Sequence, residues 1–323
     1  MQSPKNFALI GAAGYIAPRH MHAIKETGNR LVAALDPSDS VGVIDGYFPD
    51  SSFFTEFERF DRHVDKMRRS ASGDAVDYVS ICSPNYLHDS HIRFALRSDA
   101  DAICEKPIAL NPRNIEGLIE AERATGRRAW TILQLRLHPE IMRLREKFAA
   151  DAPDAPKREV ELTYITGRGT WYIHSWKGDD KKSGGIATNI GVHFFDMLGF
   201  LFGALQDNRV HVSEPTRASG YLEYERARVR WFLSIDVADI PEAARSAGQR
   251  TFRSITVDGD QIEFSGGFTD LHVASYQQIL AGNGFALADT LPAIETVAAI
   301  REAVPQSGSL SGDRHPLIAR SAG

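Results

Sequence analysis

A lysine and a histidine in different parts of the chain are the side chains best suited to proton transfer. Lys106 lies in the tripeptide Glu105-Lys106-Pro107, which follows a short apolar run with the character of a strand. An ammonium group there can hydrogen-bond a hydroxyl, and desolvation would lower its pKa until it can accept a proton. Taken alone, such a tripeptide is also compatible with a solvated surface turn.

A second candidate group belongs to a helix that we predict over residues 186–202. It carries Asn189, His193 and Asp196 at spacings of four and three residues, which places them on one helical face. A histidine oriented by a carboxylate is a suitable general base for an alcohol proton. Two alternatives stay open, a core histidine capped by Asp196 or a metal pair. The metal pair lacks an evident third ligand, so we expect no metal.

The segment from residue 8 to 17 places small residues between a predicted strand and a predicted helix. A turn of this kind lets the backbone approach a pyrophosphate at a helix N-terminus. The match to the dinucleotide fingerprint is imperfect. Gly11 fills the first glycine position, but Ala13 and Ile16 fill the second and third, with Gly14 between them. A purely structural turn is the alternative.

Asp36 ends the second predicted strand, where a carboxylate can bind the ribose 2′-hydroxyl of a dinucleotide. Its charge would repel a 2′-phosphate, so we expect NAD(H) as the cofactor. Ser83 and the residues after it follow the third predicted strand at the same edge of the sheet. The predicted cofactor-binding residues are Gly11, Ala13, Gly14, Tyr15, Ile16, Asp36, Ser83, Pro84, Asn85, His88, Glu105, Lys106 and Pro107.

Cations and aromatic rings are concentrated between residues 168 and 182, directly before the histidine-bearing helix. The cations are Arg168, Lys177, Lys181 and Lys182, and the rings are Trp171, Tyr172 and Trp176. In a chain of net charge −5, this cluster favours a polyanionic substrate with a flat ring. The alternative is a solvated loop with aromatic anchors, and residues 178–182 are the part most typical of a plain surface.

These groups need a scaffold, and the order of predicted elements indicates an α/β protein. Strands at 7–10, 31–35, 76–82, 101–104 and 129–133 alternate with helices at 18–27, 57–69, 88–97 and 114–124. This pattern predicts a doubly wound parallel sheet, hence a Rossmann NAD-binding domain over residues 1–133.

Longer alternating strands follow at 158–166, 227–237 and 253–264, the last folding back through Asp258-Gly259. Helices are predicted at 138–149, 186–202, 271–280 and 292–303. They indicate an α/β domain over residues 134–323 for substrate binding and oligomerisation. Its largely antiparallel sheet would leave one apolar face open, so we expect an oligomer.

Composition excludes several other classes of protein. The 323 residues are 43% hydrophobic and 24% charged, as in a soluble globular protein. The net charge of −5 gives no general attraction to nucleic acid or an anionic membrane. No segment has the character of a signal peptide or a membrane span, and two cysteines cannot form a disulfide framework. We expect a cytoplasmic protein with no nucleic-acid or membrane partner.

The motifs of this chain together resemble those of the glucose–fructose oxidoreductase/inositol dehydrogenase (Gfo/Idh/MocA) family. They are the glycine turn, Asp36, the strip from Ser83 to His88, Glu105-Lys106-Pro107 and the helix with His193. The resemblance implies a homodimer or homotetramer, and hydride transfer between NAD(P) and a sugar or polyol carbon. It also implies that Lys106 is the active-site lysine and His193 the catalytic histidine. The family has an aspartate where this chain has Asn189, which cannot accept a proton at neutral pH. The base is therefore His193 or Lys106.

A narrower resemblance is carried by residues 168–185, 134–139 and 271–276, which are similar to the bacterial UDP-N-acetyl-glucosaminuronate 3-dehydrogenases of lipopolysaccharide O-antigen synthesis. It implies oxidation at C3 of UDP-2-acetamido-2-deoxy-D-glucuronate, with 2-oxoglutarate as an oxidant for bound NADH. The predicted substrate-binding residues are Lys106, Gln134, Arg136, Arg168, Trp171, Trp176, Lys177, Asn189, His193 and Tyr276. A family dehydrogenase for a free sugar or polyol and a non-catalytic NAD-binding regulator stay as alternatives.

Overall fold

The chain folds into two compact units. The computed structural model describes residues 3–70, 73–152, 154–262, 270–306 and 312–319. The first unit contains residues 1–137 and 270–291, and the second contains 138–269 and 292–323. We predicted a second domain that runs without interruption from residue 134 to 323. The segment 270–291 instead returns to the first unit, because helix α11 (Leu271–Leu280) bonds through His272 to Glu105 in that unit.

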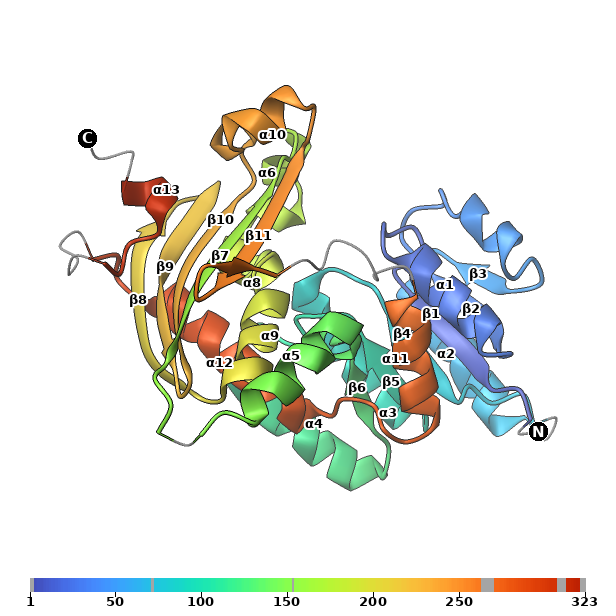
Figure 1. Ribbon diagram of the computed structural model, residues 1–323. Coiled ribbons are helices and arrows are strands. Elements are labelled where there is room, and N and C mark those ends of the chain that lie inside the picture. The colour runs from blue at the N-terminus through green and yellow to red at the C-terminus, as the bar shows by residue number, and fades with distance from the viewer. Residues whose placement is uncertain (1–2, 71–72, 153, 263–269, 307–311, 320–323) are drawn as a thin grey trace. The chain divides into compact units, whose positions relative to one another are not determined.

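The first unit is built on six parallel strands in the spatial order β3-β2-β1-β4-β5-β6 (Figure 1). They are β1 (Asn6–Ile10), β2 (Arg30–Leu35), β3 (Ser52–Phe54), β4 (Tyr78–Ile81), β5 (Asp101–Cys104) and β6 (Ala129–Thr131). Every residue of β1 is buried, as expected at the centre of a sheet covered on both faces. The strand order reverses between β1 and β4, and open α/β sheets bind ligands at such a point. The predicted doubly wound sheet is confirmed.

Helices of the first unit follow the strands in alternation. They are α1 (Ala17–Glu26), α2 (Phe57–Arg69), α3 (His88–Arg97) and α4 (Pro112–Thr125), with 3-10 turns η1 (Gly42–Gly46), η2 (Asn85–Leu87) and η3 (Gln134–Leu137). Local signals set the ends of α4: the Asn111 side chain accepts a hydrogen bond from the Arg113 N–H, and Gly126 in a left-handed conformation ends the helix. Helix α11 packs against α1, although it comes much later in the chain (Figure 1).

The second unit contains a mixed sheet in the order β12-β11-β7-β10-β9-β8. Its strands are β7 (Arg158–Thr166), β8 (Leu205–Ser213), β9 (Arg217–Tyr224), β10 (Ala227–Ser234), β11 (Thr251–Val257) and β12 (Asp260–Gln261). Only the β7–β10 pairing is parallel among the described strands, so the predicted largely antiparallel sheet is confirmed. The hairpin turn at Asp258 and Gly259 has φ values of +54° and +89°. Residues 263 and 264, predicted as strand, lie outside the described residues.

Short helices make up the rest of the second unit. They are α5 (Pro139–Ala149), α6 (Trp171–His174), α7 (Asp180–Ser183), α8 (Gly185–Asn189), α9 (Val192–Phe202), α10 (Glu242–Ser246) and α13 (Pro316–Ala319), with 3-10 turns η4 (Trp176–Gly178) and η5 (Val237–Asp239). Helix α12 (Leu287–Glu302) begins in the first unit and continues in the second. No single helix in the described part of the chain is long and apolar enough to cross a membrane. The bent pair 180–189 and 192–202 meets that test only when its two parts are taken together.

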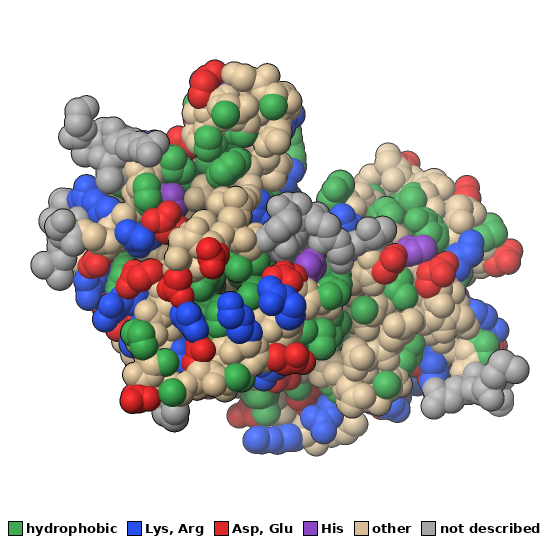
Figure 2. All heavy atoms as spheres, viewed as in Figure 1, with side chains coloured by type: hydrophobic (Ala, Val, Ile, Leu, Met, Phe, Trp, Pro, Cys, Tyr) green, Lys and Arg blue, Asp and Glu red, His purple; other side chains and the backbone are tan. Residues whose placement is uncertain are grey.

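The two faces of the second sheet differ in character. On the inner face, Trp231 packs edge-on against Phe195 of α9, with ring centroids 5.3 Å apart. The outer face carries ion pairs, including Arg230–Glu161 at 2.8 Å between the neighbouring strands β10 and β7, and Lys157–Glu223 at 2.6 Å. Acidic and basic side chains also alternate over the visible surface of this unit in Figure 2. Our expectation of an open apolar face is therefore wrong. Charges occupy several outward positions of β7, β9 and β10, and the apolar Ile165 and Phe232 on the same face are buried in a cluster with Leu317 and Ile318.

Candidate active site

The glycine turn after β1 has the geometry of a dinucleotide cradle. Gly11 has φ +90°, and a Cβ there would lie 2.6 Å from the carbonyl carbon of Cys82 and 2.7 Å from the Ser83 nitrogen. Only glycine fits this conformation and this close approach. The turn also lies at the reversal point of the strand order, directly before α1. The structure therefore offers an open backbone turn where a pyrophosphate would bind.

Asp36 lies beside that turn, although 23 residues separate it from Ala13. Its Oδ2 accepts a hydrogen bond from the Ala13 N–H at 2.9 Å, and its Oδ1 accepts one from the Ser38 N–H at 2.9 Å. The carboxylate thus sits at the end of β2 as the motif predicts. In this position it fits the ribose hydroxyls of NAD and opposes a 2′-phosphate.

The strip after β4 has a largely internal role. The ring of His88 is 1% exposed, with Nε2 2.8 Å from the Ser83 carbonyl oxygen and Nδ1 2.7 Å from the Pro107 carbonyl oxygen. The Ser83 hydroxyl lies 2.8 Å from Nδ1 of His91. His88 therefore ties together the loops that follow β4 and β5. Both of its ring nitrogens already face protein carbonyls, so we assign it the positioning of these loops.

Lys106 follows β5 and is half-buried. Burial lowers the pKa of its ammonium group, while the neighbouring Glu105 carboxylate opposes that shift. A lysine in this environment can release or accept a proton more readily than one on the surface. The predicted chemical character of Lys106 therefore agrees with its position in the first unit.

Glu105 points away from the predicted site, into the core of the first unit. Its Oε1 lies 3.0 Å from Nε2 of His20 and 2.9 Å from Nε2 of His272. Tyr276 of α11 joins the same group, since its hydroxyl lies 2.7 Å from Nδ1 of His20. We predicted Tyr276 as a substrate contact, but the structure contradicts this because its side chain is 0% exposed. The sequence did not signal a role for His20, since its partners are 85 and 256 residues away.

Two further predicted substrate residues lie in η3. The guanidinium of Arg136 donates to the Asp289 carbonyl oxygen at 2.7 Å and lies 5.2 Å from the centre of the Phe285 ring. Arg136 therefore holds η3 to the returning segment 270–291. Gln134 is half-buried in the same turn. Substrate contacts by these two side chains stay predictions.

The helix that carries His193 is broken, which corrects our prediction of one helix over 186–202. Segments 180–189 and 192–202 meet at 46°. The Gly191 N–H donates to the carbonyl oxygen of Ile186 at 3.2 Å, five residues earlier, which is a local π-type turn. Asn189 ends α8 and His193 lies in the first turn of α9. These two side chains therefore do not share the face of one regular helix.

Tyr172 provides the contact that holds Asn189. The Asn189 amide nitrogen donates to the Tyr172 hydroxyl oxygen at 2.5 Å, and Tyr172 is only 3% exposed. Burial raises the pKa of this phenol, so it stays protonated at neutral pH. We expected Tyr172 to stack on a flat ring of the substrate. The structure contradicts that expectation, because the ring is buried and its hydroxyl is bonded to Asn189.

The remaining residues of the cationic and aromatic segment are more accessible. Arg168 is exposed and Trp171 is 54% exposed. The Lys177 ammonium lies 3.8 Å from the centre of the Trp176 ring, a cation–π contact. Lys182 pairs with Asp179 at 3.7 Å. The segment thus presents cations and a large ring to solvent, as a site for a charged substrate requires.

His193 and Asp196 differ in their surroundings. His193 is half-buried and packs edge-on against the Phe194 ring, with centroids 5.3 Å apart. Asp196 is 3% exposed, and its charge adds to burial in raising the pKa of Tyr224. The carboxylate of Asp196 therefore lies near that phenol in the core of the second unit. Orientation of His193 by Asp196 stays a prediction.

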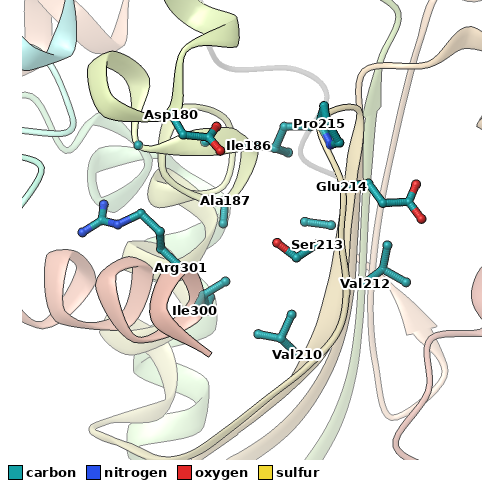
Figure 3. Close-up of a pocket in the computed structure, with 13 residues that line it drawn as sticks. Asp180, Ile186, Ala187, Val210, Val212, Ser213, Glu214, Pro215, Ile300 and Arg301 are labelled. Carbon is teal, nitrogen blue, oxygen red and sulfur yellow. The ribbon is translucent and has the colours of Figure 1, made fainter. Parts of the chain in front are cut away.

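A pocket of about 170 Å³ lies beside α8 in the second unit. Figure 3 shows Ile186 and Ala187 of α8 on one side, Val210 and Ser213 of β8 on another, and Arg301 of α12 at the rim. The described residues that line it include none of the predicted cofactor or substrate contacts. The pocket is therefore separate from the predicted residues of this unit.

Comparisons with known proteins match the Rossmann sheet and the second, mixed sheet to two family models. Residues 5–132 match the Gfo/Idh/MocA model described as "Oxidoreductase family, NAD-binding Rossmann fold", and residues 158–261 match "Oxidoreductase family, C-terminal alpha/beta domain". Among curated proteins, inositol 2-dehydrogenase from Rhizobium meliloti is 29% identical over 205 residues, which are 61% of this chain and 54% of that protein. The chain thus matches about half the length of this curated relative.

Solved structures give a closer match. The WlbA (WbpB) dehydrogenase from Thermus thermophilus in complex with NAD and UDP-GlcNAcA is 51% identical, with a TM-score of 0.91 over 97% of this chain and 99% of that chain. The same dehydrogenase in complex with NAD and alpha-ketoglutarate is 52% identical, with a TM-score of 0.92 and the same coverage. With both family models matched over most of its length, this chain belongs to the Gfo/Idh/MocA family of oxidoreductases, as its motifs predicted.

Proposed function

We propose that this chain is an NAD-dependent dehydrogenase that oxidises the C3 hydroxyl of UDP-2-acetamido-2-deoxy-D-glucuronate (UDP-GlcNAcA) to the 3-keto sugar nucleotide. One observation carries the choice of substrate. The chain is 51% identical over nearly its whole length to a dehydrogenase whose structure contains NAD and UDP-GlcNAcA. The exposed Arg168 and Trp171, with the half-buried Lys177 over the Trp176 ring, provide the charge and stacking surface that a UDP-sugar acid needs.

The residues of the first unit fit NAD. The cradle at Gly11 would be filled by any Cβ, and Asp36 lies at the turn that would hold the pyrophosphate. Bound NAD supplies a hydride acceptor for the sugar carbon. The chain itself supplies the cradle for the phosphates, the carboxylate that selects against a 2′-phosphate, and the lysine that follows β5.

Lys106 and His193 are the proposed acid–base pair. One of them takes the proton of the C3 hydroxyl, and the other stabilises the alkoxide as the hydride leaves. Asn189, held by the hydroxyl of Tyr172, binds a sugar hydroxyl without taking its proton. Arg168, Trp171, Trp176 and Lys177 bind the diphosphate, the carboxylate and the uracil.

A second half-reaction completes the proposal. The Thermus thermophilus dehydrogenase has been solved with alpha-ketoglutarate as well as with UDP-GlcNAcA. We propose that 2-oxoglutarate reoxidises NADH while it stays bound, so that one nucleotide serves many turnovers. We further propose a cytoplasmic homodimer or homotetramer that acts in lipopolysaccharide O-antigen sugar synthesis.

Incubation of the purified protein with UDP-GlcNAcA tests the substrate. Nicotinamide reduction is followed by absorbance with and without 2-oxoglutarate, and the 3-keto product is identified by mass spectrometry. The proposal expects a keto product, with sustained turnover only when 2-oxoglutarate is present. Formation of NADH from myo-inositol or a free hexose, with no product from UDP-GlcNAcA, would show a dehydrogenase for a simple polyol.

A double variant, Arg168→Ala with Lys177→Ala, tests the charged segment. Loss of the two cations should raise KM for UDP-GlcNAcA about tenfold or more while kcat changes little, since the cations bind charge away from the reacting carbon. Lys181→Ala with Lys182→Ala is the matched control, because it removes two exposed cations from the same segment. Equal KM values in the two double variants would contradict the proposed role of Arg168 and Lys177.

A further inference from the structure

A buried carboxylate lies directly behind the proposed catalytic lysine. Glu105 is 6% exposed and meets His20 of α1 and His272 of α11, which are 0% and 4% exposed. Its Oε1 lies 3.0 Å from Nε2 of His20 and 2.9 Å from Nε2 of His272. All three residues belong to the first unit, so the cluster is complete within it.

The rest of the network accommodates one arrangement of protons in which Glu105 is ionised. The Tyr276 hydroxyl is 2.7 Å from Nδ1 of His20 and 2.6 Å from the Ser80 hydroxyl. If Ser80 donates to Tyr276 and Tyr276 donates to His20, then the remaining N–H of His20 donates to Glu105. His272 donates the second hydrogen bond to the same oxygen. Every bond in this arrangement is satisfied when Glu105 is ionised and both imidazoles are neutral.

The other oxygen of Glu105 reaches the backbone of the lysine. Oε2 accepts a hydrogen bond from the Lys106 N–H at 3.3 Å. Burial alone would raise the pKa of Glu105, but the hydrogen bonds from His20 and His272 hold it well below its ordinary value. Burial lowers the pKa of Lys106, and the Glu105 charge opposes that shift. The carboxylate is thus coupled to Lys106 through both a bond and its charge.

Among the described residues, no other group that faces this pair is negatively charged at pH 7. Burial lowers the pKa of His20 and of His88, which packs nearby on α3. Burial also raises the pKa of the Cys82 and Cys104 thiols and of the Tyr276 phenol. These groups add no negative charge of their own next to Lys106. The negative charge that it meets from the core therefore comes from Glu105.

We propose that Glu105 is a positioning residue for the dehydrogenase reaction: its carboxylate, fixed by His20 and His272, keeps the Lys106 ammonium charged and holds the backbone from which Lys106 extends. This inference rests on the proposed function, in which Lys106 contacts the sugar hydroxyl. It means that the pH at which Lys106 loses its proton is set from the interior of the first unit. Loss of the Glu105 charge would lower this pH whether Lys106 acts as the base or as the stabilising cation.

Glu105→Gln removes the charge at nearly constant size: the amide oxygen still accepts from both imidazoles, while the amide nitrogen replaces the oxygen that accepts from the Lys106 N–H. Competitive labelling of lysines with acetic anhydride across a pH series, read by peptide mass spectrometry, gives the midpoint for Lys106 without any enzyme assay. We expect this midpoint to fall by about one to two pH units in Glu105→Gln. Glu105→Asp, which keeps the charge, should stay closer to the wild-type midpoint. The pH profile of kcat should move in the same direction as the labelling midpoint.

Asp101→Asn is the matched control. Asp101 begins β5, the strand that Glu105 follows, and lies about 13 Å from Glu105. Its Oδ1 accepts from the Arg128 N–H and its Oδ2 from the Trp130 ring nitrogen, and the single oxygen of an asparagine can keep one of these bonds. The variant removes one charge from the unit at a distance, so its Lys106 midpoint should equal that of the wild type. An equal fall in both variants would show a general charge effect and overturn the proposal.

A second variant, His272→Phe, and a metal analysis also test the role of Glu105. If Glu105→Gln does not fold, His272→Phe removes one donor, makes Glu105 easier to protonate and should give a smaller fall in the Lys106 midpoint. An unchanged midpoint in every folded variant overturns the proposal. The three ligand atoms also suit a divalent metal, so stoichiometric metal in the wild type that is lost in Glu105→Gln would overturn it as well. Because labelling needs no substrate, failure of UDP-GlcNAcA to react is a separate result.

Discussion

The side-chain amide of Asn189 donates a 2.5 Å hydrogen bond to the hydroxyl of Tyr172, which lies 17 residues earlier in the chain. This contact links the charged segment before α8 to the residue that takes the place of the family's aspartate. The Asn189 amide cannot accept a proton from the substrate, so its contribution depends on how its hydrogen-bonding groups are oriented. The buried phenol supplies that orientation, on which the proposed binding of a sugar hydroxyl by Asn189 relies.

Tyr172→Phe should weaken catalysis without unfolding the protein. The variant removes the acceptor of the Asn189 bond but keeps the buried ring, so we expect kcat/KM for UDP-GlcNAcA to fall about tenfold. Steady-state kinetics with a thermal melt checks this. Tyr221→Phe, which removes a hydroxyl from the outer sheet face, is the control. Equal kinetics in the wild type and Tyr172→Phe would show that the bond does not support the reaction.

Gly191→Ala should destabilise the second unit. A Cβ at residue 191 would lie 2.6 Å from the Ala187 carbonyl oxygen and 2.7 Å from the Leu233 side chain, inside the break between α8 and α9. We expect a loss of about 1–3 kcal/mol in the free energy of unfolding, because the surrounding core is close-packed. Denaturant unfolding measures this. Gly42→Ala, where no atom lies within 4 Å, should change stability by less than about 0.5 kcal/mol.

Asp36→Ser should reduce the preference for NAD. The carboxylate that fits the ribose hydroxyls and repels a 2′-phosphate is lost, so kcat/KM should fall for NAD and rise for NADP. We expect the ratio of the two to change by about tenfold or more. Kinetics with both nucleotides measures this ratio. Asp39→Ser removes an exposed carboxylate from the same loop and should leave the ratio unchanged.

Acid should destabilise the first unit through His91. Burial lowers the pKa of His91 to about 4, from an ordinary value of 6.5. The unfolded chain therefore takes up this proton at higher pH than the folded protein does. The contribution of His91 is complete above about pH 6.5 and falls as the pH drops toward 4, by up to about 3 kcal/mol.

His91→Gln should flatten this part of the pH dependence, because glutamine does not titrate. Denaturant unfolding of wild type and variant at several pH values between 7 and 4 provides the comparison. His22→Gln, which removes a half-exposed histidine of α1, should keep the wild-type slope. Parallel pH dependence in wild type and His91→Gln would show that this histidine does not titrate as its burial implies.

Several features of this protein are determined by local sequence. Short apolar runs separated by amphipathic helices are sufficient to predict a parallel sheet, because such strands must be covered on both faces. Residues 57–69 and 88–97 form helices with the predicted bounds, since their periodicity is unambiguous. The positive φ of Gly11 is also a local feature of the turn from β1 into α1, whereas the close approach that excludes a Cβ there comes from Cys82 and Ser83 after β4.

Tertiary structure decided the partners of the polar groups. Glu105 meets His20 and His272, which lie 85 and 167 residues away, because α11 returns to the first sheet. The same return buries Tyr276, which local sequence could not separate from an exposed tyrosine. The close packing at the break is also tertiary, since a Cβ at Gly191 would lie 2.7 Å from the side chain of Leu233, which a helical pattern does not encode. Local pattern selects the elements, whereas the environment of each side chain depends on which distant segment packs against it.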